Sequence, residues 1–161
     1  MPLSGCFSYL KILYSKKFLS CKNVIILKAF TKIYAMAGLR LGYVLSENET
    51  LIEKVRNSGQ PWSVSVPAQL AGSAALQNTY FIKKTAEFVS AEREFLMDNL
   101  NNMNLKVFPS EANFIMFKSE IIKLDRLLKS EDIAIRNCEN YEGLERGFYR
   151  IAVRTRKENQ Y

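Results

Sequence analysis

Two short apolar runs near the start of the chain constrain its fold most. Residues 24–27 read Val-Ile-Ile-Leu without a polar interruption, and residues 39–45 form a second, mostly apolar run. An apolar strand without alternation is typical of a sheet buried on both faces, such as the parallel sheet of an α/β protein. Two strands cannot close such a sheet by themselves. We therefore expect an α/β fold in which residues 1–59 form only the end of a larger sheet.

The remainder of the chain, residues 60–161, has the pattern of a smaller α+β domain. A breaker cluster at residues 59–63 separates it from the first part. Thr79 is expected to cap a long helix, because a hydroxyl side chain accepts hydrogen bonds from the first turn. Apolar periodicity predicts helices at 7–18, 49–57, 66–77, 80–101 and 120–129, and strands at 105–108, 113–117, 133–136 and 149–154.

Composition excludes several classes of protein. The chain has 161 residues, of which 48% are hydrophobic and 24% charged, as expected for a globular protein rather than a disordered one. It contains no His, which excludes Ser-His-Asp and Cys-His catalysis and His-ligated zinc. Its 3 Cys form neither a paired framework nor a CxxC site. We therefore expect no metal site, reduced thiols and a cytoplasmic protein.

The net charge of +7 suits an anionic partner or a solvated, Lys-rich surface. No run of 18 apolar residues predicts a membrane helix. Lys11, Lys16 and Lys17 interrupt the apolar start, so we do not expect an export signal. A nucleic-acid-binding domain has only the charge in its favour, because neither an RNP-like strand nor a helix-turn-helix signature is found.

One segment has the residues for chemistry with a small molecule. Lys32 follows the first predicted strand, with the hydroxyl of Thr31 beside it, and Arg40 lies eight residues further on, between Gly38 and Gly42. A buried lysine gives up its charge readily, and its neutral amine can form a Schiff base. Pyridoxal phosphate offers an aldehyde to that amine and a phosphate to Arg40 and Thr31. The alternative is an exposed lysine and a surface arginine in a Gly-rich turn.

The segment from Leu27 to Tyr43 resembles the cofactor-lysine motif of fold type I aminotransferases of class I and II. The motif is a hydroxyl residue and a lysine, seven intervening residues, and then an arginine in a GLRxGY frame. Within this family the chain is most similar to the threonine-phosphate decarboxylase and histidinol-phosphate aminotransferase subgroup. The decarboxylase branch is favoured by segments 60–65, 68–69, 140–144 and 148–155.

The resemblance implies a fold, a cofactor and a set of site residues. Residues 1–59 would be the C-terminal part of the large cofactor domain, and residues 60–161 the small C-terminal domain with the interdomain helix. Lys32 would bind pyridoxal 5'-phosphate and act as catalytic base and acid, while Arg40 and Thr31 would hold the cofactor phosphate. Arg150 would bind the substrate α-carboxylate and Arg136 its phosphate. The substrate would be a small phosphorylated, amino-acid-like molecule, and the full-length parent a homodimer.

The chain also departs from the family pattern. Ala29 stands where the family has a hydroxyl, and Ser4–Phe7 is the best match to a segment that should contain an Asp for the pyridine nitrogen. The chain would then be the truncated C-terminal half of a longer enzyme, and a catalytically inactive fragment is the alternative. Arg154 is expected on the same strand face as Arg150, since side chains alternate along a strand.

Overall fold

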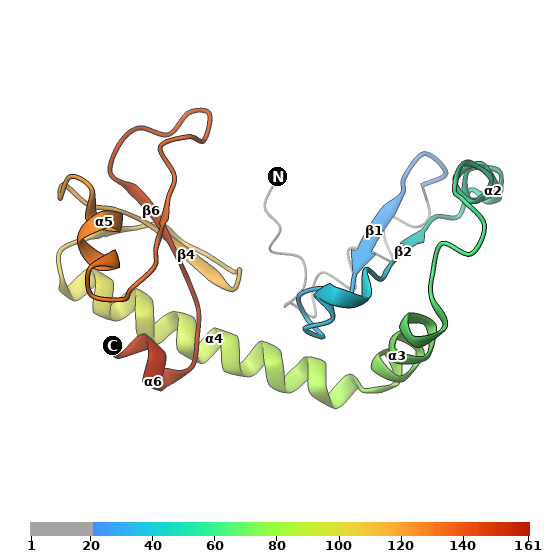
Figure 1. The fold of residues 1–161 in the computed structure, drawn as a ribbon, viewed down its shortest axis with the longest axis horizontal. Coiled ribbons are helices and arrows are strands. Elements are labelled where there is room, and N and C mark those ends of the chain that lie inside the picture. The colour runs from blue at the N-terminus through green and yellow to red at the C-terminus, as the bar shows by residue number, and fades with distance from the viewer. Residues whose placement is uncertain (1–20) are drawn as a thin grey trace. The chain divides into compact units, whose positions relative to one another are not determined.

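The computed structural model describes residues 21–161 as two compact units (Figure 1). One unit contains residues 21–85 and the other residues 86–161, so the division falls within the long helix α4 (Thr79–Asn102). The boundary at 59/60, expected from the family's domains, stays a prediction. The expected helix 7–18 and the segment Ser4–Phe7 lie outside the described residues. Within 21–161, no helix is both long and apolar enough to cross a membrane.

The first unit is built on one antiparallel strand pair. Strands β1 and β2 pair so that Ile26 lies opposite Leu45 and Ala29 opposite Gly42. The expectation of parallel strands buried on both faces is therefore wrong for these residues. Burial alternates along β1, and Leu27 is 77% exposed. The connection holds no full crossover helix, so the chain returns antiparallel. The elements of this unit are β1 (Ile26–Ala29), η2 (Ala37–Leu39), β2 (Gly42–Leu45), α2 (Glu49–Ser58) and α3 (Val66–Gln77).

A small apolar core fixes the ends of the strand pair against α3. Phe30, Leu41, Ala68 and Ala75 are buried together. The close approach depends on Gly72, because a Cβ there would lie 2.5 Å from the Leu41 side chain. The segment between the two strands is thus held at both of its ends.

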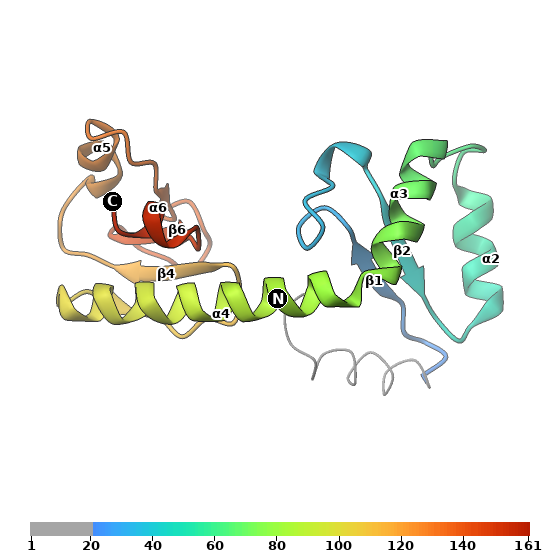
Figure 2. The ribbon, with the colours of Figure 1, turned by 90° about the horizontal axis from the view of Figure 1, so that it is seen from below.

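The second unit is a four-stranded antiparallel sheet with the order β3-β4-β6-β5. One face is buried and contains Ile115, Phe117 and Tyr149, and the second half of α4 runs along the sheet (Figures 1 and 2). Arg93 of α4 donates a 3.2 Å hydrogen bond to the carbonyl of Ala112. The elements are β3 (Lys106–Val107), β4 (Phe114–Lys118), α5 (Leu124–Lys129), β5 (Arg136–Asn137), β6 (Phe148–Ala152) and α6 (Arg156–Asn159).

The element boundaries confirm the predicted order and correct some details. Helix α3 has the predicted bounds, 66–77. Asn78, not Thr79, caps α4, since its side-chain oxygen accepts the backbone N–H of Phe81 at 3.0 Å. Helix α5 begins only at Leu124, because Lys123 before it has a left-handed backbone with φ of 59°.

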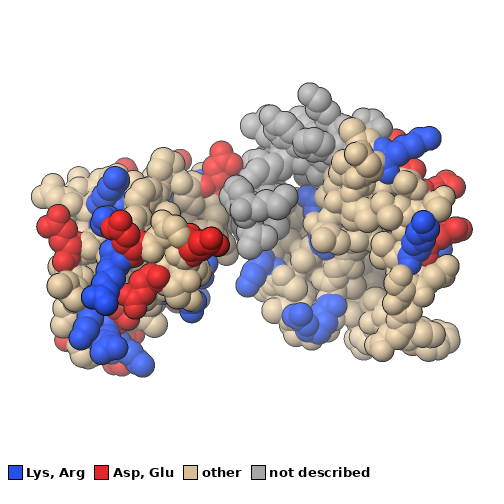
Figure 3. Space-filling model, turned by 90° about the horizontal axis from the view of Figure 1, so that it is seen from above, with Lys and Arg blue, Asp and Glu red and all other residues tan. Residues whose placement is uncertain are grey.

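Charge is unevenly distributed over the surface. In the view of Figure 3, Lys and Arg side chains form a band on the unit of residues 86–161, at the left, and acidic side chains border it.

Candidate functional site

The loop between β1 and β2 brings the first set of predicted site residues together. The backbone N–H of Phe30 donates to the carbonyl of Leu41 at 3.2 Å, and both side chains are buried. This hydrogen bond closes the loop. Thr31 and Lys32 directly follow Phe30 in sequence, and Arg40 directly precedes Leu41. Residues eight positions apart in sequence therefore lie at the same end of one closed loop.

The first turn of the loop is held by its own backbone and by an aromatic pair. The N–H of Tyr34 donates to the carbonyl of Phe30 at 3.3 Å, and the N–H of Ala35 to that of Lys32 at 3.1 Å. The rings of Phe30 and Tyr34 stack at 5.3 Å. Burial, and to a smaller extent Tyr43, raises the pKa of the Tyr34 hydroxyl. These contacts fix the backbone from which the Lys32 side chain projects.

Lys32 is exposed in this structure, so the expectation of a buried lysine is wrong for the described residues. Thr31 beside it is half-buried. This exposure matches the alternative of a surface lysine. Lys32 and Arg40 nevertheless lie at the same end of the loop, which is the arrangement needed to bind an aldehyde and a phosphate of one ligand. The Lys32 side chain is therefore accessible to a ligand.

Arg40 occupies an unusual backbone position. It ends η2 in the left-handed region, with φ of 52° and ψ of 41°, and its Nη1 donates to the carbonyl of Ala37 at 3.2 Å. Such a backbone costs a non-glycine residue on the order of 1–2 kcal/mol, and functional sites are where such strain is often found. The bond to Ala37 directs the guanidinium and leaves most of its five N–H groups to donate elsewhere.

Of the two glycines beside Arg40, Gly42 has a role in strand pairing, whereas the expected role of Gly38 stays a prediction. A Cβ at Gly42 would lie 2.9 Å from the carbonyl oxygen of Lys28. Gly42 therefore allows close strand pairing rather than a close approach to a ligand. A Cβ at Gly38 would meet nothing within 4 Å.

The second set of predicted site residues lies on the four-stranded sheet. Arg136 of β5 and Arg150 of β6 are directly opposite each other in register, so both point from the same face. Arg150 lies over the ring of Phe114 at 4.9 Å, and Arg136 over that of Tyr141 at 5.9 Å. Burial raises the pKa of the Cys138 thiol, and the charges of Arg150 and Arg136 partly offset this. Two cations thus share one small area.

Arg154 does not join this pair. Strand β6 ends at Ala152, and the Nε of Arg154 donates instead to Glu158 at 3.1 Å. The side chain and backbone of Thr155, with Arg154, lower the pKa of the Glu158 carboxyl to about 2. Arg154 therefore belongs to the cap of α6, and the expectation that it continues the face of Arg150 is wrong.

Sequence reasoning missed the rings under the two arginines. Phe114 follows Asn113 at the start of a predicted strand, but residues 114–117 are all apolar, so no alternation indicates which of them lies on the face of Arg150. Tyr141 lies in a polar loop with no periodic signal. Thr31, Lys32 and Arg40 lie in the unit of residues 21–85. Arg136 and Arg150 lie in the unit of residues 86–161.

Comparison with protein families identifies residues 14–161 with the model for aminotransferase class I and II. A threonine-phosphate decarboxylase of Salmonella typhimurium is 35% identical over 141 residues, which are 86% of this chain and 39% of that protein. A histidinol-phosphate aminotransferase of Methanosphaera stadtmanae is 33% identical over 144 residues, again 86% of this chain and 39% of that protein. The chain thus spans well under half the length of these relatives.

Solved structures agree with this match. The histidinol-phosphate aminotransferase from Clostridium acetobutylicum superposes with a TM-score of 0.86 at 30% identity, over 91% of this chain and 46% of that one. A decarboxylase from Sulfurospirillum multivorans has a TM-score of 0.78 at 28% identity, and the match covers 91% of this chain and 39% of that one. The histidinol-phosphate aminotransferase from Sinorhizobium meliloti, solved in complex with pyridoxal-5'-phosphate, has a TM-score of 0.73 at 25% identity. The match covers 90% of this chain and 40% of that one. The α/β fold expected from the sequence, that of part of a fold type I aminotransferase, is confirmed.

Proposed function

Because the chain belongs to the aminotransferase class I and II family, we propose that it binds pyridoxal 5'-phosphate through the loop between β1 and β2. The loop closure from Phe30 to Leu41 carries this proposal, since it brings Lys32, Thr31 and Arg40 to one end of the loop. An amine, a hydroxyl and a guanidinium are the groups that an aldehyde and a phosphate require. The residues present therefore fit the amine-binding and phosphate-binding ends of the cofactor.

In this proposal each residue has a separate task. When bound, the cofactor supplies an electron sink for the substrate α-carbon. Lys32 would hold the cofactor through its Nζ, and its amine would donate a proton to the substrate α-carbon after loss of carbon dioxide or, in amino transfer, remove one from it. Arg40 and Thr31 hold the cofactor phosphate. Arg150 binds and orients the substrate α-carboxylate, which selects the bond to be broken.

We propose a phosphorylated, amino-acid-like substrate for the whole protein, with L-threonine O-3-phosphate as the first candidate. Two arginines directly opposite each other repel unless an anion lies between or beside them. Arg136 would take the substrate phosphate and Arg150 its carboxylate. The decarboxylase from Salmonella and the segments 60–65 and 140–144 favour decarboxylation. Amino transfer to histidinol phosphate precursors is the second candidate, supported by the relatives of that name.

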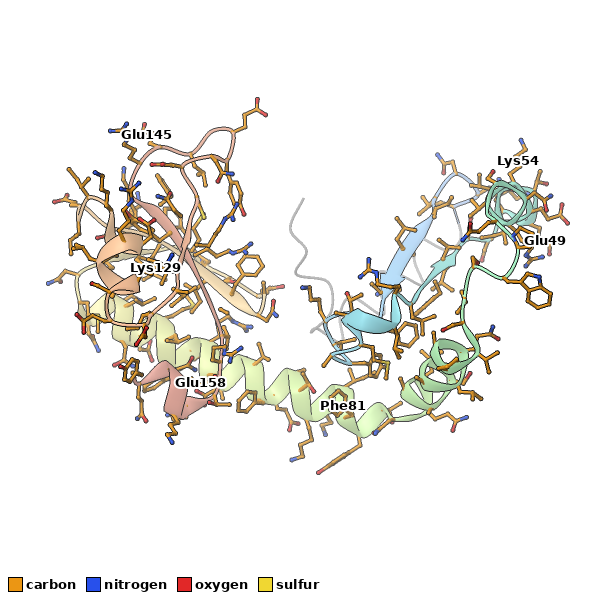
Figure 4. The ribbon with its side chains drawn as sticks, viewed as in Figure 1. Glu49, Lys54, Phe81, Lys129, Glu145 and Glu158 are labelled. Carbon is orange, nitrogen blue, oxygen red and sulfur yellow. The ribbon has the colours of Figure 1, made fainter. Side chains whose placement is uncertain are left out.

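Reductive labelling tests the cofactor proposal. The chain is mixed with pyridoxal phosphate, reduced with borohydride and digested, and the labelled lysines are identified by mass spectrometry. We expect Lys32 to be labelled at the lowest cofactor concentration. Lys54, an exposed lysine of α2 labelled in Figure 4, is the internal control. Equal labelling of Lys32 and Lys54 at every concentration would contradict the proposal.

Two variants separate the roles of the loop residues. Arg40→Gln should weaken cofactor binding about tenfold or more, because it removes charge-assisted bonds to the phosphate. Arg56→Gln removes the same charge from α2 and should have no effect. The substrate proposal is tested by adding L-threonine O-3-phosphate or L-histidinol phosphate to the loaded chain and following the cofactor absorbance. A preference for histidinol phosphate would favour the second candidate.

A catalytically inactive fragment is the remaining alternative. Ala29 replaces a hydroxyl of the family pattern, and no Asp occurs among residues 1–31. Label at Lys32 without release of carbon dioxide or transfer of the amino group would support this alternative. The cofactor proposal would then stand while the proposal of activity would fail.

We also propose that the full-length parent is a cytoplasmic homodimer. Several large apolar side chains on α3 are exposed, namely Val66 at 66%, Leu70 at 68% and Leu76 at 53%. Val66 and Leu70 lie one turn apart on the same face of the helix, and exposed apolar side chains grouped in this way are typical of a surface covered in an assembly. Light scattering of the protein and of Leu70→Glu tests this proposal, and an unchanged mass for the variant would argue against α3 as the interface.

A further inference from the structure

One face of the four-stranded sheet contains a cation from every strand. Lys106 of β3 lies directly opposite Lys118 of β4, and Arg136 of β5 directly opposite Arg150 of β6. Lys118 also lies opposite Phe148, two residues before Arg150 on β6. Because side chains alternate along each strand, all four cations belong to the same face. The lysine pair is thus a diagonal neighbour of the arginine pair.

Like charges directly opposite each other destabilise a sheet. Here the same face contains two such pairs. Among the described residues, a carboxylate lies within ion-pair distance of only one of the four cations: Glu145 is 3.9 Å from the Nζ of Lys118, and its side chain is 84% exposed. Glu145 lies on the loop that leads into β6 (Figure 4). An ion pair as exposed as Lys118–Glu145 contributes little to stability. The sheet face with the four cations therefore keeps its positive potential.

Aromatic rings hold the two lysines over the sheet without neutralising them. The Nζ of Lys106 is 5.6 Å from the centre of the Phe108 ring, and that of Lys118 is 5.2 Å from the centre of the Phe148 ring. The two rings stack on each other at 5.6 Å. A cation over a ring keeps its charge and its N–H donors while losing freedom of motion. The two ammonium groups are therefore preorganised on one aromatic platform, which lowers the entropy lost on binding.

We propose that Lys106 and Lys118 form a binding site for a phosphoryl group, separate from the Arg136–Arg150 pair. Two ammonium groups are matched in charge by one phosphoryl dianion, whereas a carboxylate would leave one lysine uncompensated. Lys106 is exposed and Lys118 is partly exposed, so both ammonium groups can be reached from solvent. The ligand is either free phosphate or the phosphoryl end of a small molecule. This inference does not rest on cofactor binding.

A titration of the full chain with inorganic phosphate tests the site. Backbone amide signals of Lys106 and Lys118 are followed by NMR at constant ionic strength, and we expect saturable shifts. Lys106→Gln with Lys118→Gln should weaken binding about tenfold or more. The matched control, Lys129→Gln with Lys157→Gln, removes the same charge from exposed positions of the same unit and should leave the affinity unchanged. The melting temperature of the first double variant should not fall, because the variant removes a repulsion.

Three results would overturn the proposal: shifts that stay linear with phosphate, an affinity unchanged by the Lys106 and Lys118 variants, or an equal loss in the control variant. A third variant, Arg136→Gln, identifies the source of the phosphoryl group. If the Lys106 and Lys118 variants weaken binding of O-phospho-L-threonine, and Arg136→Gln also weakens it without changing the affinity for phosphate, the group arrives on a ligand that also reaches the arginine pair. If Arg136→Gln changes neither affinity, free phosphate is the ligand. Both results support a lysine site.

Discussion

Gly42 offers the most direct test of the loop geometry. A Cβ at this position would lie 2.9 Å from the backbone oxygen of Lys28, which is too close for a non-bonded contact. The oxygen cannot move aside alone, because Lys28 is paired with Tyr43 in the β1–β2 ladder. Gly42→Ala must therefore push the strands apart, and overpacking of this kind costs about 1–3 kcal/mol.

Gly38→Ala is the matched control, since it makes the same chemical change four residues earlier. Nothing lies within 4 Å of a Cβ at Gly38, and its backbone does not need a positive φ. Replacing such a glycine stabilises a protein by about 0.4–1 kcal/mol, because the unfolded chain loses freedom. The two variants should therefore change stability in opposite directions.

Thermal unfolding and labelling of Lys32 together measure the effect. For a chain of this size, 1 kcal/mol corresponds to about 2–4 °C in melting temperature. Gly42→Ala should also slow the labelling of Lys32 by pyridoxal phosphate, because it disturbs the closure next to Ala29 and Gly42. Equal melting temperatures for the two variants would refute the steric argument. A destabilised Gly42→Ala with unchanged labelling would refute the link between strand pairing and the site.

Three further predictions concern the second unit. Ile115→Ala should cost about 2–5 kcal/mol in urea unfolding, since Ile115 is fully buried, whereas Ile122→Ala, at a position 78% exposed, should stay within about 0.5 kcal/mol. Tyr149→Phe should cost about 1–3 kcal/mol, because it leaves the N–H of Leu124, now 3.1 Å from the hydroxyl, without its acceptor; an unchanged unfolding midpoint would contradict this role. The folded pKa of Glu158 is about 2, below its ordinary 4.5, so the unfolded chain takes up the proton first as pH falls. The stabilisation is present above pH 4.5 and lost towards pH 2, and Glu158→Gln should flatten the dependence of melting temperature on pH across this window.

Local rules predicted the helices more accurately than the strands. The Ala-rich segment 66–77 has Ser65 before it and Pro67 in its first turn, and these signals fix a helix without help from the rest of the chain. The direction of β1 relative to β2 depends on how the loop returns, which no local pattern encodes. The same limit explains α5, where a left-handed Lys123 delays the start of a helix that apolar spacing placed earlier.

The candidate site divides in the same way. The motif alone identified Lys32, Thr31 and Arg40, because residue types and their spacing are what a Schiff base and a phosphate require. Its spacing did not show that Lys32 is exposed. Exposure depends on which neighbouring groups pack around a side chain, and those groups come from distant parts of the sequence.

The sequence by itself determined the family, the order of helices and strands, and the residue types available for chemistry. Only the tertiary structure decided which of these residues meet. The closure from Phe30 to Leu41 joins the two ends of the loop, and strand register sets Arg136 opposite Arg150 and Lys106 opposite Lys118. Register is a long-range property, since a slip of one residue would send each of these side chains to the other face. It is fixed by the buried face of Ile115, Phe117 and Tyr149, and so the packing of the core determines where the cations of the opposite face lie.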